Sequence, residues 1–226
     1  MELTKHQYVS LKTTLPVFPH GAARACSQPI TTPRLILRPL EETDLSSFFA
    51  LRSVPEVMTF TSQGVPDADL EATKKVFARF LPPNDDDTYN LAICERDTGR
   101  FVGVGGNLGR QGELGWPGVG YAFFPEVWGR GYGTEFLKAF MEHWWELERE
   151  EAVVRAESMT LQGLGRELVE GEEGREMIVA VVQDRNAASG RVLKKAGFEQ
   201  VAEWIAEDLR GSGLVRLLVF ACARPE

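Results

Sequence analysis

The amino-acid sequence of 226 residues predicts an α/β (α+β) fold, and three stretches carry this prediction. An apolar strand pattern over 119–124 runs through a glycine-rich turn into a long amphipathic helical pattern. A continuous apolar run over 177–182 is typical of a strand covered on both faces, and a short helical pattern follows it. Two further apolar stretches flank a polar turn as the arms of a hairpin. We therefore expect one mixed domain over residues 30–226.

Residues 1–29 mix prolines and a glycine with short apolar pieces and show no sustained period. We expect an N-terminal extension that is at best partly ordered. The extension contains few acidic residues, as a transit peptide would, but it is not rich in arginine, and this disfavours a transit peptide.

The first predicted strand covers 34–40, and two predicted helices follow it. Thr43 is expected to cap the first helix, because apolar residues follow it at helical spacing. Asp67 or Asp69 is expected to cap the second helix, which ends near Leu81, before a run of proline and acidic residues.

The predicted hairpin joins strands over 90–95 and 101–108. Gly99, in the turn between them, can adopt the left-handed backbone conformation that such a turn needs. Glycines at several positions of the second arm predict a bulge or the close approach of a neighbouring backbone.

A long amphipathic helix is expected from about Thr134 to Arg149, with its apolar face packed on the sheet. Residues 150–175 carry many charges and several glycines, so we expect this segment to be part helix and part loop. Two closing strands are expected over 199–205 and 214–223, on either side of a glycine-containing turn. The predicted order is βααβββ, then α, β, α, β, β.

The composition is that of a soluble globular protein, with 43% hydrophobic and 26% charged residues. A formal net charge of −8 disfavours nucleic acid as a partner and favours a cationic acceptor such as an amine. The three cysteines and three histidines lack the spacing of a metal site, so we expect no bound metal, and reduced thiols in a cytoplasmic protein. No apolar run is long enough to span a membrane and no apolar signal core is present, so we expect neither a membrane span nor secretion.

The turn after the fourth strand reads as a phosphate-binding loop. Its glycines alternate with larger residues in the order Gly129, Arg130, Gly131, Tyr132 and Gly133. Because glycine lacks a Cβ, this backbone can adopt positive φ values and approach a ligand closely, and the helix that follows offers unpaired N–H groups to an anion. A Walker-type loop ends in Gly-Lys-Ser/Thr, but here Gly131 is followed by Tyr132. A dinucleotide loop needs a third glycine at the position of Thr134. Neither of these loops fits the spacing.

The loop resembles the acyl-CoA loop of the GNAT N-acetyltransferase superfamily, Gln/Arg-x-x-Gly-x-Gly/Ala, with Gly131 and Gly133 at its small positions. Trp128 replaces the Gln or Arg, which resembles the ribosomal-protein alanine N-acetyltransferase branch, whose loops often read Trp-Gly-Lys-Gly-Tyr-Ala-Thr-Glu. Two further stretches are similar to that branch. Thr32–Asp44 resembles its first strand and helix entry, and Asn186–Phe198 resembles its Asn-x-x-Ser and Lys-x-Gly-Phe segment.

The resemblance implies a mixed, mostly antiparallel central sheet of about seven strands flanked by helices, in which the parallel fourth and fifth strands splay apart to admit acyl-CoA. Residues 150–175 then read as an insertion before the fifth strand. The implied co-substrate is acetyl-CoA, with its pyrophosphate at the glycine loop and its pantetheine arm along the edge of the fourth strand. The implied contacts are Phe123, Phe124, Trp128, Gly129, Arg130, Gly131, Tyr132, Gly133, Thr134, Asn186 and Ser189.

Catalytic residues are harder to assign. Much of the superfamily has a tyrosine acid seven residues after the asparagine, where this chain has Leu193. The resemblance offers Ser189 as the hydroxyl for the leaving thiolate, although Asn186 and Ser189 at a helix start are also ordinary caps. Glu126 and Glu113, near the two ends of the fourth strand, are candidate general bases, although most such carboxylates are solvated. An α-amino group, with a pKa of about 8, needs less help from a base than a lysine side chain.

We therefore expect an N-acetyltransferase that moves an acetyl group from acetyl-CoA to a primary amine by direct attack in a ternary complex. The acceptor is a protein N-terminus, as is typical of the resembled branch, or a small amine. In the resembled fold the first two helices and their loop form one wall of the acceptor site, which makes Met58, Phe60 and Ser62 candidate contacts. The alternative is a non-catalytic acyl-CoA-binding protein, and Thr134 disfavours a dinucleotide-binding oxidoreductase. We expect a monomer or a homodimer.

Overall fold

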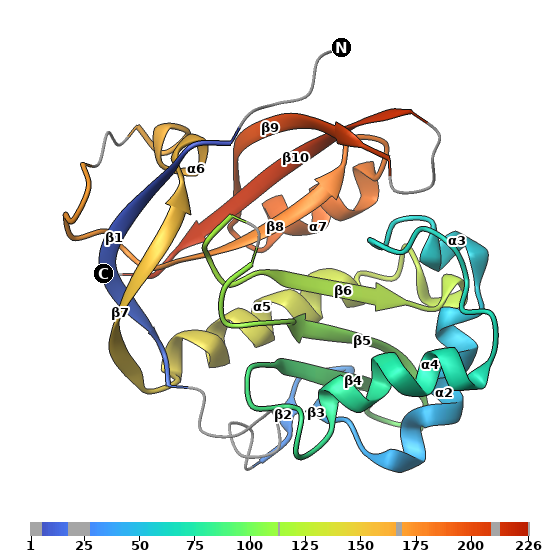
Figure 1. Cartoon of the computed structure of the whole chain (residues 1–226). Helices are drawn as coiled ribbons and strands as arrows, with labels where there is room; N and C mark the ends of the chain where they lie inside the picture. Colours follow the sequence, from blue (N-terminus) through green and yellow to red (C-terminus); the bar gives the residue numbers. More distant parts are fainter. Residues whose placement is uncertain (1–5, 18–27, 113, 166–168, 209–212, 226) are drawn as a thin grey trace. The chain divides into compact units, whose positions relative to one another are not determined.

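The computed structural model describes residues 6–17, 28–112, 114–165, 169–208 and 213–225 (Figure 1). The chain divides into two compact units. Unit 1 comprises residues 1–17, 109–119 and 145–226, and unit 2 comprises residues 18–108 and 120–144. The predicted glycine loop therefore lies in unit 2.

Unit 2 is built on a five-stranded sheet with the strand order β2-β3-β4-β5-β6. Its strands are β2 (Ile30–Thr31), β3 (Leu35–Pro39), β4 (Tyr89–Glu95), β5 (Phe101–Asn107) and β6 (Val119–Phe123). The pairs from β2 to β5 are antiparallel, with Leu37 opposite Ile93 and Ile93 opposite Gly103. β6 is an edge strand of this sheet, so one side of its backbone faces away from β5.

The predicted hairpin between β4 and β5 is confirmed. Gly99 lies in its turn with a φ of 70°, in the left-handed region. A Cβ added at Gly103 would lie 2.3 Å from the carbonyl oxygen of Ala122, and one at Gly105 would lie 2.5 Å from the ring of Phe136. The glycines of β5 therefore permit close approach of the next strand and of the helix packed on it.

Helices cover both faces of the five-stranded sheet. They are α2 (Leu45–Arg52), α3 (Pro55–Met58), α4 (Leu70–Phe77) and α5 (Tyr132–Glu146), with short 3₁₀ turns η1 (Glu42–Asp44), η2 (Ala78–Phe80) and η3 (Pro125–Val127). The Tyr89 ring contacts Phe140 of α5, whereas Ala92 packs in a cluster with Phe48 of α2 and Phe77 of α4. Residues 89 and 92 of one strand face opposite sides of the sheet, so α5 covers one face and α2 and α4 cover the other.

One of the two predicted helix caps is confirmed. The prediction that Thr43 caps the first helix is wrong, because Thr43 lies inside η1 and Glu41 forms a capping box with Asp44. Asp69 caps α4 as predicted, and its carboxylate accepts a hydrogen bond from the Ala72 N–H at 2.8 Å. The acidic run before the first helix contains several possible caps, and the box geometry selects the earlier one.

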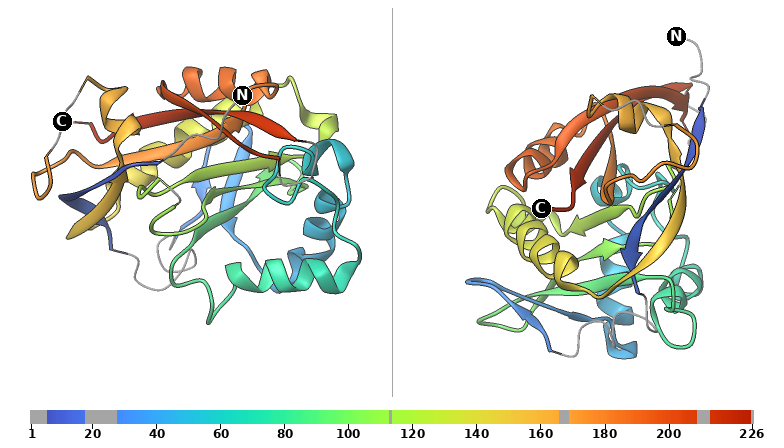
Figure 2. Two further views of the ribbon diagram at one scale, coloured as in Figure 1. Left: turned by 45° about the horizontal axis from the view of Figure 1, so that its top comes forward. Right: turned by 90° about the vertical axis from the view of Figure 1, so that its left-hand side faces the viewer.

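Unit 1 contains two antiparallel sheets. The three-stranded sheet has the order β8-β10-β9, with β8 (Met177–Gln183), β9 (Glu199–Glu207) and β10 (Leu214–Ala223). The two-stranded sheet pairs β1 (Tyr8–Pro16) with β7 (Arg149–Glu157), which run side by side in Figures 1 and 2. The helices of this unit are α6 (Ser158–Gln162) and α7 (Ala187–Lys195).

The pairing of β1 with β7 was not expected from the sequence. β1 lies in the N-terminal extension, and its Leu11 and Leu15 are fully buried in a cluster with Trp116 and Val154. The prediction of part helix and part loop for residues 150–175 holds for α6 but is wrong for residues 150–157, which lie in β7. Charged residues dominate the first half of β7 and hide the apolar alternation that is typical of a strand. Each strand is specified by its distant partner rather than by its own pattern.

The predicted fourth and fifth strands correspond to β6 and β8. Gly118 and Val179 form a parallel bridge, and the Val179 N–H donates to the Pro117 carbonyl at 2.9 Å. Beyond this bridge β6 belongs to the five-stranded sheet and β8 to the three-stranded sheet. The expectation of a parallel contact at the start of these strands is confirmed by this bridge. The strands of the described residues form three sheets instead of the expected one sheet of about seven.

Candidate functional site: a glycine loop at the start of α5

The glycine loop joins β6 to α5 within unit 2. Gly129 and Gly131 have φ values of 74° and 84°, in the left-handed region that favours glycine. A Cβ added at Gly129 would meet no atom within 4 Å, so the backbone conformation, not a lack of space, favours glycine there. A positive φ was also expected to be available at Gly133. However, α5 begins at Tyr132 rather than near Thr134, so Gly133 lies in the first turn of the helix instead of in the loop.

The start of α5 provides hydrogen-bond donors for an anion. The Glu135 N–H donates to the Gly131 carbonyl at 3.1 Å, which is the first helical hydrogen bond. The N–H groups of residues 132–134 therefore have no partner within the helix. They lie at the positive end of the dipole of a helix of 15 residues, and the side chain of Arg130 is exposed beside them. This arrangement is suited to a phosphate group.

The first sequence motif meets the glycine loop at Glu135. The Thr32 hydroxyl and the Arg34 N–H donate to Oε1 of Glu135 at 2.7 and 2.8 Å. The Arg34 guanidinium binds Oε2 through Nε at 2.7 Å and Nη2 at 2.6 Å. Burial raises the pKa of Glu135, but these hydrogen bonds outweigh burial and lower the pKa below its ordinary value. Glu135 is thus held as a carboxylate.

The end of β6 has a defined hydrogen-bonding pattern. The Phe124 N–H donates to the Val102 carbonyl in β5 at 3.0 Å, so it points into the sheet. The Phe123 carbonyl accepts a hydrogen bond of 2.8 Å from the indole N–H of Trp128. Because adjacent residues of a strand alternate in direction, the Phe123 N–H points to the outer edge of β6. Two of the groups expected to pair with a pantetheine arm are therefore already engaged within the protein.

The second motif of the sequence lies in unit 1, at the start of α7. Asn186 caps this helix, and its side-chain oxygen accepts a hydrogen bond of 3.2 Å from the Ser189 N–H. Leu193, at the position of the family tyrosine, is fully buried. The side chain at this position therefore contributes to the core and offers no hydroxyl.

Two candidate bases were predicted near the ends of the fourth strand. Glu126 belongs to η3, and its Oε1 lies 3.6 Å from Nη1 of Arg100. Its side chain is 53% exposed, so water reaches the carboxylate. Glu113 lies outside the described residues.

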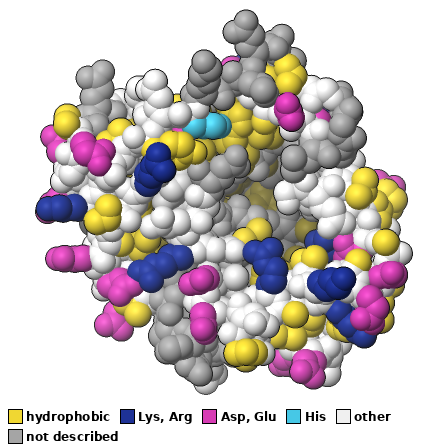
Figure 3. All heavy atoms as spheres, in the orientation of Figure 1, with side chains coloured by type: hydrophobic (Ala, Val, Ile, Leu, Met, Phe, Trp, Pro, Cys, Tyr) yellow, Lys and Arg dark blue, Asp and Glu magenta, His cyan; other side chains and the backbone are white. Residues whose placement is uncertain are grey.

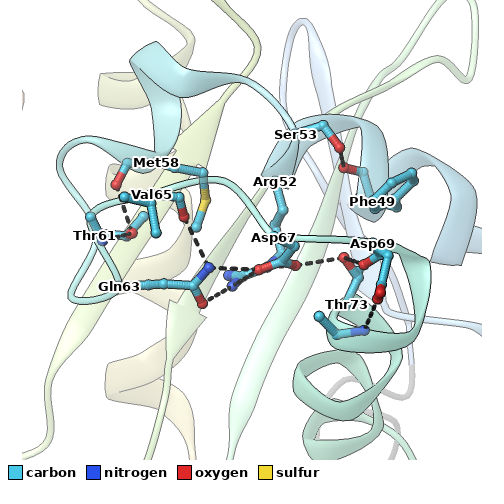
Figure 4. Close-up of polar contacts among 12 residues, drawn as sticks. Phe49, Arg52, Ser53, Met58, Thr61, Gln63, Val65, Asp67, Asp69 and Thr73 are labelled. Carbon is cyan, nitrogen blue, oxygen red and sulfur yellow. Dashed lines mark hydrogen bonds and ion pairs between the residues drawn. The ribbon is translucent and has the colours of Figure 1, made fainter.

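The three candidate acceptor contacts lie at the end of α3 and in the segment between α3 and α4. Met58 is buried, whereas Phe60 and Ser62 are exposed. Figure 4 shows this segment folded over a polar network in which Arg52 and Gln63 converge on Asp67. Two residues of the segment can therefore meet a ligand from solvent, while Met58 is part of the core.

Asp67 is the centre of this network. Arg52 binds its carboxylate through Nε at 2.6 Å and Nη2 at 2.8 Å, and the Thr73 hydroxyl donates to Oδ2 at 2.5 Å. The Gln63 amide donates to Oδ1 at 2.8 Å and accepts from Arg52 at 2.8 Å. Burial raises the pKa of Asp67, but the hydrogen bonds from Arg52, Thr73 and Gln63 lower it to about 2. These contacts thus fasten the segment between α3 and α4 to both α2 and α4.

Two features of the site were missed by sequence reasoning. Asp67 was considered only as a helix cap, whereas it pairs with Arg52, 15 residues earlier. Arg34 was noted as part of a strand motif, but its partner Glu135 is 101 residues away. A buried Asp or an Arg beside a strand gives no local signal of such distant partners, so only the fold brings them together.

The mixed α/β fold, with a glycine loop between an edge strand and a helix, defines a class of protein, the acetyltransferases that share this fold. The chain belongs to the GNAT family, because the model of the acetyltransferase (GNAT) domain matches residues 34–199. It is therefore an N-acetyltransferase, and acetyl-CoA is the donor that this family uses.

Solved structures share this fold. An acetyltransferase of the GNAT family from Bacillus anthracis is 18% identical with a TM-score of 0.62, over 88% of this chain and 100% of that chain. Spermidine N-acetyltransferase from Vibrio cholerae, in complex with CoA and spermine, is 12% identical with a TM-score of 0.63, over 85% and 97% of the two chains. A structure from Vibrio cholerae assigned as a ribosomal-protein-serine acetyltransferase is 18% identical with a TM-score of 0.58, over 87% and 97%. No curated relative matches the chain.

Proposed function

We propose that the protein transfers the acetyl group of acetyl-CoA to a primary amine, by direct attack of the amine in a ternary complex. The observation that carries this proposal is the glycine loop, in which left-handed Gly129 and Gly131 lead into the unpaired N–H groups at the start of α5. Family membership makes acetyl transfer the general reaction, and the loop is the part of this chain that fits the donor.

The donor is held through its pyrophosphate and pantetheine arm in this proposal. The N–H groups of residues 132–134 bind pyrophosphate oxygens, and Arg130 adds a charge-assisted contact. The pantetheine amides pair with the outer edge of β6. Since the Phe123 N–H points to this edge, it is the donor best oriented to polarise the thioester carbonyl.

The reaction forms a carbon–nitrogen bond and breaks the thioester carbon–sulfur bond. The amine loses one proton, and the thiolate of CoA gains one. We assign the first proton to Glu126 through a bridging water, because its carboxylate is exposed at the end of β6. We assign the second proton transfer to Ser189, in the first turn of α7. Its hydroxyl donates a proton to the thiolate and regains one from water, which balances the proton that the amine releases. Leu193 supports this choice, because it offers no hydroxyl at the position where much of the family has a tyrosine acid.

The acceptor we favour is the α-amino group of a protein N-terminus, with small amines as the second choice. An α-amino group has a pKa of about 8 and is partly neutral at pH 7, so a water-linked carboxylate is sufficient as a base. The loop of Trp128 also resembles the branch that acetylates ribosomal-protein N-termini. The net charge of −8 suits a cationic acceptor better than nucleic acid. On the face drawn in Figure 3, Lys and Arg side chains of the described residues lie among Asp and Glu side chains.

We also propose a cytoplasmic location. Cys94 and Cys222 are free thiols, as is usual in a reducing compartment. Separately, among the residues that the structure describes, no helix is long and apolar enough to cross a membrane.

The test is the release of free CoA from acetyl-CoA with a panel of amines that includes peptides with free N-termini, polyamines and free amino acids. Turnover with peptides alone supports the N-terminal acceptor, and turnover with polyamines alone transfers the assignment to small amines. Binding of acetyl-CoA without turnover on any amine would establish the alternative, a non-catalytic acyl-CoA-binding protein. If acetyl-CoA does not bind, the proposal fails.

A further inference from the structure

Arg34 contacts the glycine loop on both sides of Gly131. Its Nη1 donates to the carbonyl of Arg130 at 2.8 Å, and its Nε and Nη2 bind Glu135 in the first turn of α5. The guanidinium also lies over the ring of Tyr132, 4.8 Å from its centroid. One side chain from the strand motif therefore contacts the residues before and after Gly131.

The contact with the Arg130 carbonyl fixes the direction of a neighbouring N–H group. In a planar trans peptide, the Arg130 carbonyl and the Gly131 N–H point in opposite directions. Arg34 draws the carbonyl to its own side, so the Gly131 N–H points away from Arg34. Glycine populates positive and negative φ about equally, so a peptide at Gly131 is easily turned over unless a partner holds it. Arg34 supplies that partner.

The contact with Glu135 removes an electrostatic obstacle. A carboxylate in the first turn of α5 would repel a pyrophosphate bound at the same helix end. Four hydrogen bonds or ion-pair contacts from Thr32 and Arg34 hold this carboxylate. The positive charge of Arg34 compensates the negative charge of Glu135, so the helix dipole and Arg130 remain to attract the anion.

From this geometry we propose that Arg34 and Glu135 are positioning residues that preset the glycine loop for the pyrophosphate of acetyl-CoA. This inference rests on the proposed function of the loop. It concerns two residues that contact the loop from outside and are not themselves assigned to the donor or the acceptor. These two residues should therefore affect binding of the pyrophosphate part of the donor, and not the reaction of the thioester or binding of the amine.

The decisive comparison uses two donors, acetyl-CoA and S-acetyl-pantetheine, which carries the same thioester but has no pyrophosphate. For Arg34→Met we expect kcat/KM for acetyl-CoA to fall about tenfold to a hundredfold, the range for losing hydrogen bonds between charged groups. We expect kcat at saturating acetyl-CoA, the KM for the amine and kcat/KM for S-acetyl-pantetheine to change less than about twofold. Arg34→Lys should recover part of the loss, because lysine keeps the charge but cannot bind the Arg130 carbonyl and Glu135 together.

The matched control is Lys74→Met, which breaks an exposed ion pair with Glu71 on α4 in the same unit. It should leave both donors unaffected. The double variant Arg34→Met with Glu135→Gln should bind acetyl-CoA more tightly than Arg34→Met alone, because it removes the negative charge that has lost its counter-charge. An equal loss for both donors in Arg34→Met, or no loss for either, would overturn the inference.

Failure of the inference is distinguishable from failure of the proposed function. If the unaltered protein does not bind acetyl-CoA in calorimetry, the function of the loop fails and the inference fails with it. If the unaltered protein binds acetyl-CoA and Arg34→Met binds it equally well, only the inference fails. If binding occurs without turnover, the ratio of dissociation constants for acetyl-CoA and S-acetyl-pantetheine replaces kcat/KM in the same comparison.

Discussion

At Gly131 a single backbone angle links the sequence to the chemistry of the loop. Its φ of 84° lies where residues with a Cβ cost about 1–2 kcal/mol more than glycine. A Cβ at this position would lie 3.4 Å from Nη2 of Arg34, which is tight but not prohibitive. Glycine is therefore favoured here by conformation and by the ligand that the loop is proposed to approach.

Gly131→Glu is expected to abolish acetyl-CoA binding while the protein stays folded. The new carboxylate places negative charge and bulk where the pyrophosphate is proposed to lie. Gly171→Glu is a matched control, because Gly171 has the same φ of 84° and open space around its Cβ, but lies in unit 1. Calorimetric titration of both variants with acetyl-CoA checks this prediction. Unchanged affinity in Gly131→Glu would remove the loop from the mechanism.

Asp67 gives a pH dependence to stability. Its pKa in the folded protein is about 2, below the ordinary value of 3.8, so its contribution is present above pH 3.8 and is lost as the pH falls towards 2. The difference corresponds to about 2 kcal/mol. Asp67→Asn should therefore be less stable than the unaltered protein at pH 5, and the gap in unfolding free energy should close towards pH 2. Urea titrations at several pH values test this.

The control for Asp67→Asn is Asp97→Asn. Asp97 is 91% exposed and lies 3.8 Å from Arg96, so its replacement should change the unfolding free energy by less than about 1 kcal/mol at every pH. A gap for Asp67→Asn that does not vary with pH would contradict the assignment, because it would show that the loss is one of packing.

At the scale of elements, Glu176 connects the sheets of unit 1. It directly precedes β8 and is buried, and its Oε2 accepts from Arg149 at the start of β7 at 2.9 Å and from Thr14 of β1 at 3.1 Å. Arg224, directly after β10, lies 3.9 Å from the same oxygen. Burial lowers the pKa of Arg149, and the carboxylate of Glu176 opposes that shift. A buried carboxylate thus links the two-stranded sheet of β1 and β7 to the three-stranded sheet.

Glu176→Ala is expected to destabilise the protein by about 3–5 kcal/mol, because it leaves the Arg149 guanidinium buried without its counter-charge. Glu176→Met combined with Arg149→Met should recover much of this loss. Glu203→Ala is the control, since Glu203 forms an exposed pair with Arg216 and should cost less than about 1 kcal/mol. Chemical denaturation measures all three. Equal losses for Glu176→Ala and Glu203→Ala would show that the buried pair is not the link between the sheets.

Across the whole molecule, the sequence was sufficient to predict an element when the residues of that element alone carry its pattern. Strand, glycine loop and helix were predictable at 119–146 because apolar period, glycine spacing and helix pattern follow each other without interruption. β1 and β7 were not, because the few buried residues of β1, such as Leu11 and Leu15, stand among polar ones. In the site, the loop was predicted, but the contacts of Arg34 were not, because they join residues about a hundred positions apart.

The stability of the whole chain should depend on the donor. At about a hundredfold excess of acetyl-CoA over its Kd, binding adds about 2.7 kcal/mol and raises the Tm by about 5–10 °C for a chain of this size. NAD and ATP serve as controls and should give no comparable shift, since neither a dinucleotide nor a Walker pattern is present in the loop. A melting temperature that acetyl-CoA leaves unchanged would refute the proposed donor site.

Trp128 gives the protein an intrinsic optical reporter. Its indole N–H is fixed to the Phe123 carbonyl, yet its side chain is 48% exposed beside the loop, whereas Trp116, Trp144 and Trp204 are buried. Emission from Trp128 should therefore lie to the red of the buried tryptophans and be quenched when an adenine-containing donor binds nearby. Trp128→Phe should abolish that response, so the occupancy of the loop can be followed by fluorescence without any label.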